Sequence, residues 1–461
     1  MKKIGFISLF LAFLCALPCF YGCKKSGGGQ NERGKYLLEV KYDDGEISGS
    51  VTYTFYENVS DGSVKQTAFN LYPNAARGKA EGMTVKSVEV NGQTASFEYS
   101  GDKDEFLLIR SKNGFISGDK IKIEFCTQVP YSEERLGKTQ KTVNAAYFYP
   151  QKCVFENGRY LMRPYSPFGD PFFCDFDDYT VRLTVPSVMT VACGFKTTGV
   201  VADGPLTEYD YVLNGARSFA FSLGEQYEIV TKKWGNRSIN YYYYDEDEPI
   251  KTLEFVCGAL NFYEEKAGEY PFETLSFAKS PYSSGGMEYS AFFVVGETPD
   301  LRDYLYAAAH EAAHQWFPMC VGTDEYECAY FDEGLAEFLT AEYIASSDGV
   351  YGKSLKNTAR ERYSSYKKNY EAFKKPYKKT IKFPLNEYVS LYEYVCCAYC
   401  GGASMFFDLC DGAGKNNFYS ALKMFYKKNL FSNVSDDRFV KSFPIFSRGK
   451  AKKIYLKYTG R

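Results

Sequence analysis

Histidine is almost absent from this sequence, which has two histidines in 461 residues. Both stand in AAAHEAAHQWF, residues 307–317, as His310 and His314 with Glu311 between them. A serine or cysteine nucleophile activated by a histidine base would have to use His310 or His314 as that base. The scarcity of histidine therefore removes rival catalytic sites of that kind from the rest of the chain.

An excess of basic charge is also lacking, because 55 lysines and arginines face 57 acidic residues and the net charge is -2. Proteins that bind nucleic acid neutralise its phosphates with cationic side chains. We therefore expect no nucleic-acid partner. The composition, with 45% hydrophobic and 24% charged residues, is that of a globular protein, and the length predicts two or three domains.

The sequence lacks a convincing membrane span, because its N-terminal apolar run, MKKIGFISLFLAFLCALPCFYGC, is too short. Two lysines followed by such a run are typical of a secretory signal. The cysteine after Gly22 resembles the lipobox of bacterial lipoproteins, which implies a lipid on Cys23. We predict a signal peptide over 1–22, a flexible tether over 23–33, and an extracytoplasmic protein anchored by lipid to a bacterial cell membrane. Plain secretion is the alternative.

Repeated cysteine pairs with the spacing of a structural zinc site are missing. Of fourteen cysteines, two lie in the predicted signal and Cys23 would carry the lipid, which leaves an odd number, eleven. A single CxxC spans Cys397 to Cys400. We interpret most cysteines as small buried apolar residues and leave their pairing open.

Two kinds of pattern divide the chain near residue 228. From 34 to 228, segments such as YLLEVKY and YTVRLTVP alternate apolar and polar residues between turn residues, which predicts an antiparallel β domain. From 229 to 461, longer helical segments such as FDEGLAEFLTAEYIASS dominate. The expected fold class is therefore α+β with more than one domain.

The histidine pair is expected on a helix over 299–317. Thr298 would cap its first amides, Pro299 suits the first helical position, and Pro318 would stop it. Asp300 complements the positive end of the helix dipole.

On a helix, the sequence spacing of the two histidines determines the directions of their side chains. Residues four apart project about 40° from each other, so His310 and His314 can both reach one metal ion. Glu311 projects beside that face, where a carboxylate can act as general base on water at the metal. A catalytic zinc needs a third protein ligand and an open position, and Glu333 in AYFDEGLAEF can supply the ligand.

These residues resemble the signature of the aminopeptidase N-like family of gluzincins, HExxH followed after eighteen residues by Glu in an (N/D)EG sequence. The resemblance implies one zinc ion per chain, bound by His310, His314 and Glu333. Asp332, which precedes the third ligand, would orient a histidine by hydrogen bonding.

A second motif, SSGGMEYSAFF, precedes the histidines and resembles the family's Gly-x-Met-Glu-Asn exopeptidase motif. The matching residues are Gly285, Gly286, Met287 and Glu288. In the family this glutamate holds the α-amine of the substrate. The resemblance therefore implies that Glu288 binds the N-terminus of the peptide and so positions its first peptide bond for cleavage. Tyr289 departs from the usual Asn, which affects substrate preference and pocket shape.

A third segment, EYVCCAYCGGASMFFDL, is similar to the family segment in which a tyrosine precedes Glu-Lys-Gly-Ala. Aligning Gly402 with that glycine places Tyr399 on the catalytic tyrosine, which donates a hydrogen bond to the oxyanion. Tyr394 is the alternative or a second donor. Cys400 and Gly401 replace the family's Glu and Lys.

The resemblance covers about residues 34–425. It implies a saddle-like N-terminal β domain followed by a thermolysin-like, mainly helical zinc peptidase domain, without the large C-terminal helical domain of full-length members. The expected function is a zinc aminopeptidase that hydrolyses the first peptide bond of peptides with a free N-terminus at the extracytoplasmic surface of the membrane. Two alternatives stay open: a zinc endopeptidase or processing enzyme with the same site, and a surface lipoprotein that binds peptides without catalysis.

Overall fold

The computed structural model describes residues 33–56, 64–78, 80–372 and 380–460. Arg33–Arg461 form one compact unit, separate from Met1–Glu32. The predicted signal peptide, Cys23 and the tether before Arg33 lie outside the described residues. In the described part of the chain, none of the helices has the length and apolar character needed to cross a membrane.

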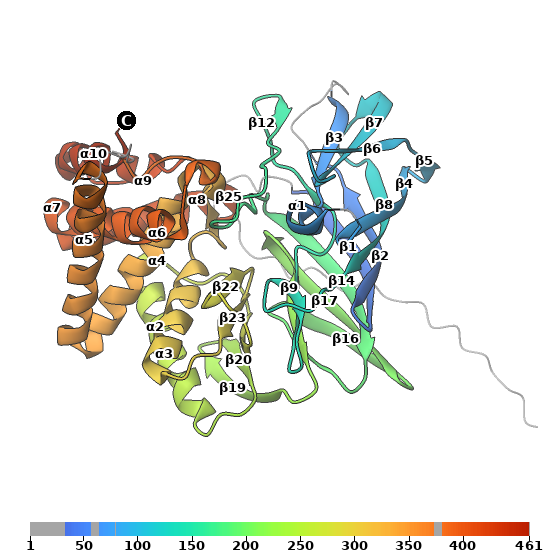
Figure 1. Cartoon of the computed structure of the whole chain (residues 1–461), viewed down its shortest axis with the longest axis horizontal. Helices are drawn as coiled ribbons and strands as arrows, with labels where there is room; N and C mark the ends of the chain where they lie inside the picture. Colours follow the sequence, from blue (N-terminus) through green and yellow to red (C-terminus); the bar gives the residue numbers. More distant parts are fainter. Residues whose placement is uncertain (1–32, 57–63, 79, 373–379, 461) are drawn as a thin grey trace, which may run out of the picture. The chain divides into compact units, whose positions relative to one another are not determined.

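An eight-stranded sheet dominates the N-terminal half, in the order β16-β17-β14-β1-β2-β8-β4-β5 (Figure 1). Its strands are β1 (Lys35–Asp43), β2 (Glu46–Thr54), β4 (Met83–Val90), β5 (Gln93–Thr94), β8 (Lys120–Gln128), β14 (Asp177–Pro186), β16 (Lys196–Asp203) and β17 (Leu206–Ala216). Buried and exposed side chains alternate along β1 and β8, because successive strand residues point to opposite faces. Neighbouring strands are antiparallel except β1 and β14, which run parallel, so the predicted antiparallel pattern is confirmed apart from this pair.

Two four-stranded sheets complete the β half, in the orders β15-β18-β10-β9 and β11-β3-β7-β6. Their strands are β3 (Val64–Asn70), β6 (Phe97–Ser100), β7 (Phe106–Phe115), β9 (Leu136–Lys138), β10 (Val143–Ala146), β11 (Gln151–Lys152), β15 (Thr190–Ala192) and β18 (Ala220–Gly224). A short helix, α1 (Tyr72–Arg77), follows β3, and a small hairpin joins β12 (Phe155–Glu156) to β13 (Arg159–Tyr160). Strands β9 and β10 pair antiparallel. Arg135 immediately precedes β9 and Tyr147 immediately follows β10, so this pair of strands positions two side chains that are described below.

The second half begins with a five-stranded sheet in the order β19-β20-β21-β23-β22. Its strands are β19 (Glu228–Trp234), β20 (Arg237–Tyr243), β21 (Thr274–Ser280), β22 (Gly286–Tyr289) and β23 (Phe292–Gly296). Strand pairing thus changes to a new sheet at Glu228. The domain boundary proposed near that residue stays a prediction, because Arg33–Arg461 form a single compact unit.

Helices make up most of the second half. They are α2 (Pro249–Ala267), α3 (Leu301–His314), α4 (Glu325–Ser347), α5 (Gly349–Ala372), the 3-10 turn η1 (Leu385–Glu387), α6 (Leu391–Tyr394), the π-helix η2 (Val395–Gly401), α7 (Gly402–Ala413), α8 (Lys415–Asn429), α9 (Arg438–Lys441) and α10 (Ile445–Thr459). A two-residue parallel pair, β24 (Val321–Gly322) and β25 (Ser432–Asn433), joins the chain after α3 to the chain after α8.

Helix α3 is shorter than the predicted span 299–317. The Asp300 side chain accepts a hydrogen bond from the Arg302 amide at 2.8 Å, so Asp300 is the cap and the predicted cap, Thr298, is wrong. The C-terminal end is at His314, and residues 315–320 form turns. Pro318 lies four residues beyond the last residue of the helix.

A buried ion pair fastens α4 to the β half. Arg217 directly follows β17, Glu325 is the first residue of α4, and the Arg217 Nη2 atom lies 3.2 Å from Glu325 Oε2. Both side chains are buried. Removing one partner of a buried pair leaves an uncompensated charge, at a cost of about 3–5 kcal/mol. The start of α4 is therefore held against the β half, and Glu333 follows it in the chain after a kink at Cys328.

Candidate active site

The two histidines and Glu333 meet at one point between α3 and α4. His310 Nε2 lies 3.0 Å from His314 Nε2 and 3.2 Å from Glu333 Oε2, and His314 Nε2 lies 3.5 Å from the same oxygen. Two ligands of a tetrahedral zinc ion with bonds of about 2 Å lie about 3.3 Å apart. Two imidazole nitrogens and one carboxylate oxygen at these separations fit a zinc ion, so the three predicted ligands are brought together.

Each remaining ring nitrogen lies close to an oxygen atom. His314 Nδ1 donates to the Phe317 carbonyl oxygen at 2.9 Å. His310 Nδ1 lies 3.1 Å from Glu337 Oε1, and the other oxygen of Glu337 accepts from the Tyr306 hydroxyl at 2.5 Å. Such contacts leave Nε2 free for a metal and raise its basicity. Sequence reasoning missed Glu337, although it lies four residues after Glu333 and so on the same face of α4.

Asp332 lies beside the cluster. Its carboxylate, the Glu288 carboxylate and a nitrogen of His314 lie within 4.8 Å of one another, and all three residues are buried. In the described residues, the Phe317 carbonyl accepts the hydrogen bond that orients His314, and Glu337 lies at ion-pair distance from His310. The orienting role expected of Asp332 stays a prediction.

The electrostatics of the cluster favour an ionised third ligand. Burial alone would raise the pKa of Glu333, but hydrogen bonds from His310 and His314 outweigh it and hold that pKa well below its usual range. Burial lowers the pKa of His310, yet its hydrogen bonds to Glu333 and Glu337 raise it to about 10. The cluster is therefore a concentrated set of proton or cation acceptors inside the protein.

Glu311 points into the cavity beside the cluster. It is buried, and its Oε2 atom has no hydrogen-bond partner among the described residues. Burial, and then the charge of Glu288, raise the pKa of Glu311 to about 8. Gly286 makes room for this carboxylate, because a Cβ atom there would lie 2.5 Å from both Cγ and Oε1 of Glu311. The edge strand β22 therefore packs directly against the expected general base.

Glu288 lies on the same strand, buried, with its Oε1 atom 3.9 Å from His314 Nδ1. Burial raises the pKa of Glu288 to about 7, against the opposing charge of His314. The turn before the strand requires Gly285, whose φ of 89° suits glycine. The Met287 sulfur accepts a hydrogen bond from Arg135 Nε at 3.1 Å.

Tyr289, which replaces the family's Asn, turns away from the cavity. Its side chain is fully buried and packs against Phe292, with ring centroids 6.0 Å apart, and against Tyr147 at 6.1 Å. The Tyr289 carbonyl accepts from Gln315 Nε2 at 3.1 Å, which ties β22 to the turn after α3. The departure from the motif thus changes the core behind the cavity, and Tyr289 is not among the residues that line it.

Both candidate tyrosines reach the cluster. The hydroxyls of Tyr399 and Tyr394 donate to Glu333 Oε1 at 2.6 Å and 3.1 Å. In an α-helix, residues five apart would point about 140° away from each other. The π-helix η2 has an i to i+5 repeat, so it stacks the two side chains on one face.

Two motif glycines let the helices that carry these groups touch. A Cβ atom on Gly334, beside Glu333, would lie 2.4 Å from backbone atoms of Gly402. A Cβ atom on Gly402 would lie 2.3 Å from the Tyr330 carbonyl oxygen. Glycine at both positions therefore allows α4 and the start of α7 to approach closely, which brings Tyr399 within reach of Glu333.

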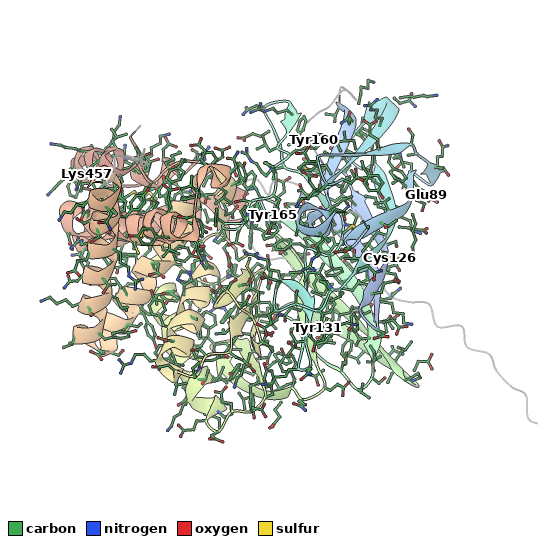
Figure 2. The ribbon with its side chains drawn as sticks, in the orientation of Figure 1. Glu89, Cys126, Tyr131, Tyr160, Tyr165 and Lys457 are labelled. Atoms are coloured by element: carbon green, nitrogen blue, oxygen red, sulfur yellow. The ribbon has the colours of Figure 1, made fainter. Side chains whose placement is uncertain are left out.

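The cluster opens into a cavity of about 960 Å³ that both halves line. The β half contributes Arg135, Asp170 and Phe172. Arg135 forms an ion pair with Asp170, and its guanidinium lies 5.1 Å from the centre of the Phe172 ring. Figure 2 shows Tyr165, another lining residue, between the strands and the helices. Sequence reasoning assigned no site residue to the β half, because these residues come together only through the fold.

Comparisons with known proteins agree with this arrangement. Residues 251–456 match the family model described as the peptidase family M1 domain. No curated protein matches the sequence at a significant level.

Solved structures share the fold of both halves. A crystal structure of a variant M1 zinc metallopeptidase from Deinococcus radiodurans has a TM-score of 0.68 and 16% identity, over 93% of this chain and 94% of that one. A second structure of the variant, bound to a Tyr-Ser-Ala substrate, has a TM-score of 0.65 and 16% identity, with coverage of 93% and 94%. Native leukotriene A4 hydrolase from Saccharomyces cerevisiae has a TM-score of 0.64 and 16% identity, over 92% of this chain and 66% of its own.

The fold and the site together define a metallopeptidase built from a β half and a thermolysin-like helical half. The resemblance found in the sequence is confirmed to this extent: residues 251–456 match the peptidase family M1 domain, and solved M1 zinc metallopeptidases share the fold of both halves. This family implies zinc as the metal.

Proposed function

We propose that the protein is a zinc aminopeptidase that removes the first residue of peptides with a free α-amine. The observation that carries this proposal is the position of Glu288, a buried carboxylate that borders the cavity 3.9 Å from a ring nitrogen of His314. An ammonium group that pairs with Glu288 would place the first peptide bond of the substrate beside the histidines. The relative solved with a Tyr-Ser-Ala substrate supports a peptide as the ligand here.

His310, His314 and Glu333 would hold one zinc ion per chain. When bound, zinc supplies a Lewis acid that polarises the scissile carbonyl and lowers the pKa of water. Glu311, whose Oε2 atom is free of hydrogen bonds within the described residues, takes the proton from the attacking water and later gives it to the leaving amine. Asp332 supports the ligand set from beside His314.

Tyr399 donates a hydrogen bond from its hydroxyl to the oxyanion that forms as the carbonyl is attacked, and Tyr394 is the second donor. Both hydroxyls contact Glu333 Oε1, at 2.6 Å and 3.1 Å, and so lie beside the residues that would hold the zinc ion. Gly285, Gly286 and Met287 border the same cavity and would contact the first residue of the substrate.

The test compares matched aminoacyl reporters with free and acetylated α-amines, together with metal content. Hydrolysis of the free reporter alone, by protein with one zinc per chain, is the expected result. Equal hydrolysis of both reporters would contradict the role of Glu288 and favour a zinc endopeptidase. Zinc bound without turnover on a broad reporter panel would favour a non-catalytic peptide-binding protein.

We further propose that the enzyme works outside the cytoplasm, held at a bacterial membrane by a lipid on Cys23, with secretion as the alternative. The N-terminal sequence supports this location. The test is metabolic labelling with a radioactive fatty acid in a bacterial host. Label in the wild-type protein and none in Cys23→Ser is expected, and an unlabelled wild-type protein in the culture medium would favour secretion.

A further inference from the structure

The last long helix, α10, exposes two large apolar side chains at its start. Ile445 and Phe446 are 85% and 81% exposed, although their helix is packed against α7 (Figure 1). Ser447, Ala451 and Tyr455 form the buried face of α10. The apolar pair therefore points away from the protein and lacks a packing role within the described residues.

Exposed cations continue the face that the apolar pair begins. At about 100° per residue, Phe446 shares one stripe with Lys450, Lys453 and Lys457, within an arc of about 60°. Ile445 shares a second stripe with Arg448 and Lys452. All five of these cationic side chains are exposed, and α10 contains no acidic residue.

The sequence around α10 also carries a net positive charge. Residues 421–460 contain ten lysines and arginines and two aspartates, in a chain whose net charge is -2. Asp436 is buried and lies 2.7 Å from the Lys382 ammonium, and Asp437 pairs with Lys441 at 2.6 Å. Neither aspartate is therefore available to offset the cations of α10.

Most of the α10 cations are free to meet an external anion. Lys457 lies 3.4 Å from an Asp408 oxygen, and Figure 2 shows it at the edge of the helical half. The Arg448 guanidinium donates to the Phe443 carbonyl. Among the described residues, no carboxylate pairs with the three remaining lysines, which are Lys450, Lys452 and Lys453.

We propose that this face of α10 docks on an anionic phospholipid bilayer. The apolar pair, Ile445 and Phe446, would enter the boundary between headgroups and acyl chains, and the cationic stripes would contact the headgroup phosphates. Nucleic acid offers phosphates but no apolar layer for the exposed pair, so it explains only half of the surface. The proposal depends neither on a lipid at Cys23 nor on peptidase activity.

The first experiment measures co-sedimentation with vesicles. It uses a chain that begins at Arg33, because Arg33–Arg461 form a compact unit of their own and the apolar N-terminal run is then absent. Vesicles of phosphatidylcholine are compared with vesicles in which about one third of the lipid is phosphatidylglycerol. Binding to the anionic vesicles, weak binding to the neutral ones and loss of binding at high salt are expected.

Matched variants separate the two halves of the surface. Replacing both Ile445 and Phe446 with serine should weaken binding at least about ten-fold. As a control, serine at Val200 and Val201 of β16, which are 56% and 58% exposed, should leave binding unchanged.

Charge reversal tests the cationic stripes. The triple variant Lys450→Glu, Lys452→Glu and Lys453→Glu should abolish binding to the anionic vesicles. Its control reverses three exposed lysines of the β half, Lys65, Lys86 and Lys112, and should keep most of the binding. Unchanged melting temperatures and reporter hydrolysis would show that each variant is folded.

A tryptophan reporter tests insertion directly. The wild-type tryptophans, Trp234 and Trp316, are buried, so Phe446→Trp adds one exposed fluorophore. Its emission should shift to shorter wavelength with phosphatidylglycerol vesicles, while Val201→Trp should not shift. Equal binding to neutral and anionic vesicles would overturn the proposal. Binding to anionic vesicles that survives in both the serine variant and the charge-reversal variant of α10 would also overturn it.

Discussion

Glu311 and His314 lie three residues apart in one helix, yet their removal should have different consequences. Glu311→Gln should keep zinc and lose turnover by about 10²- to 10⁴-fold, because only proton transfer is removed. His314→Ala should lose both zinc and turnover, because two ligands do not hold the ion. Zinc analysis and reporter kinetics on both variants check this, and near wild-type turnover in Glu311→Gln would remove the general-base assignment.

Glu337 is predicted to act through His310. Replacing it with glutamine removes the carboxylate that lies 3.1 Å from His310 Nδ1, so zinc affinity should fall about 10- to 100-fold. Competition with a chelator measures the affinity, and excess zinc should restore turnover. The control is Glu342→Gln on the same helix, whose carboxylate accepts from Lys415 and Tyr419 away from the cluster. Equal affinities for the two variants would show that Glu337 is only structural.

The residues that the sequence could predict are those whose spacing lies within one helix or one motif. His310, His314 and Glu333 meet as expected from HExxH and the later DEG. Arg135 and Asp170 could not be predicted, because they are 35 residues apart in irregular segments and meet each other only in the folded β half. Their place beside Met287 depends on contacts between distant parts of the chain.

At the scale of elements, the contact between α4 and α7 is predicted to be intolerant of a single methyl group. Gly334→Ala would place Cβ 2.4 Å from the Gly402 backbone, so the helices must separate. Overpacking of this kind should cost about 1–3 kcal/mol and should lower kcat as Tyr399 moves. Gly449→Ala is the control, because a Cβ atom there meets nothing within 4 Å. Thermal unfolding and reporter kinetics measure both effects, and equal stability of the two variants would contradict the close approach.

The π-helix η2 is an element that the sequence did not reveal. EYVCCAYC reads as an ordinary helical segment, in which Tyr394 and Tyr399 would be alternatives on different faces. The wider turn is stabilised by packing against the helices around it, since η2 contacts α4 and α5 as well as its neighbours in sequence. Tertiary contacts of this kind leave no local pattern. The open choice between the two tyrosines becomes a pair that contacts one carboxylate oxygen.

At the scale of the whole molecule, the cysteines are predicted to behave as buried apolar residues. All eleven described cysteines are free, and Cys126 alone among them is partly exposed. Burial raises the pKa of Cys126 to about 11, so its reactive thiolate is scarce at pH 8 and its labelling rate should rise about ten-fold per pH unit below that value. A thiol reagent at pH 8 should therefore modify Cys126 slowly and the others hardly at all.

Unfolding the chain that begins at Arg33, without reductant, should release eleven reactive thiols. A titre of nine would show a disulfide and contradict this prediction. The sequence led to the same interpretation of most cysteines but left their pairing open, because distances between residues far apart in the chain decide it.

The fold class could be inferred from patterns that repeat along the whole chain. Alternating strands followed by long helices predicted the order of the two halves, and the related solved structures share it. The parallel pair β1 and β14 was not expected, because 133 residues separate the ends of those strands and pairing over that distance leaves no trace in local periodicity.

The near absence of histidine has a practical consequence. Both imidazoles of the chain lie in the candidate metal cluster, with their Nε2 atoms 3.0 Å apart. Isotope labelling of histidine alone would thus give a magnetic resonance spectrum with two ring systems, both reporting on that one place. Titration with cadmium would shift the resonances of both rings together. Metal binding to a 52.4 kDa protein could thus be followed through the signals of two residues.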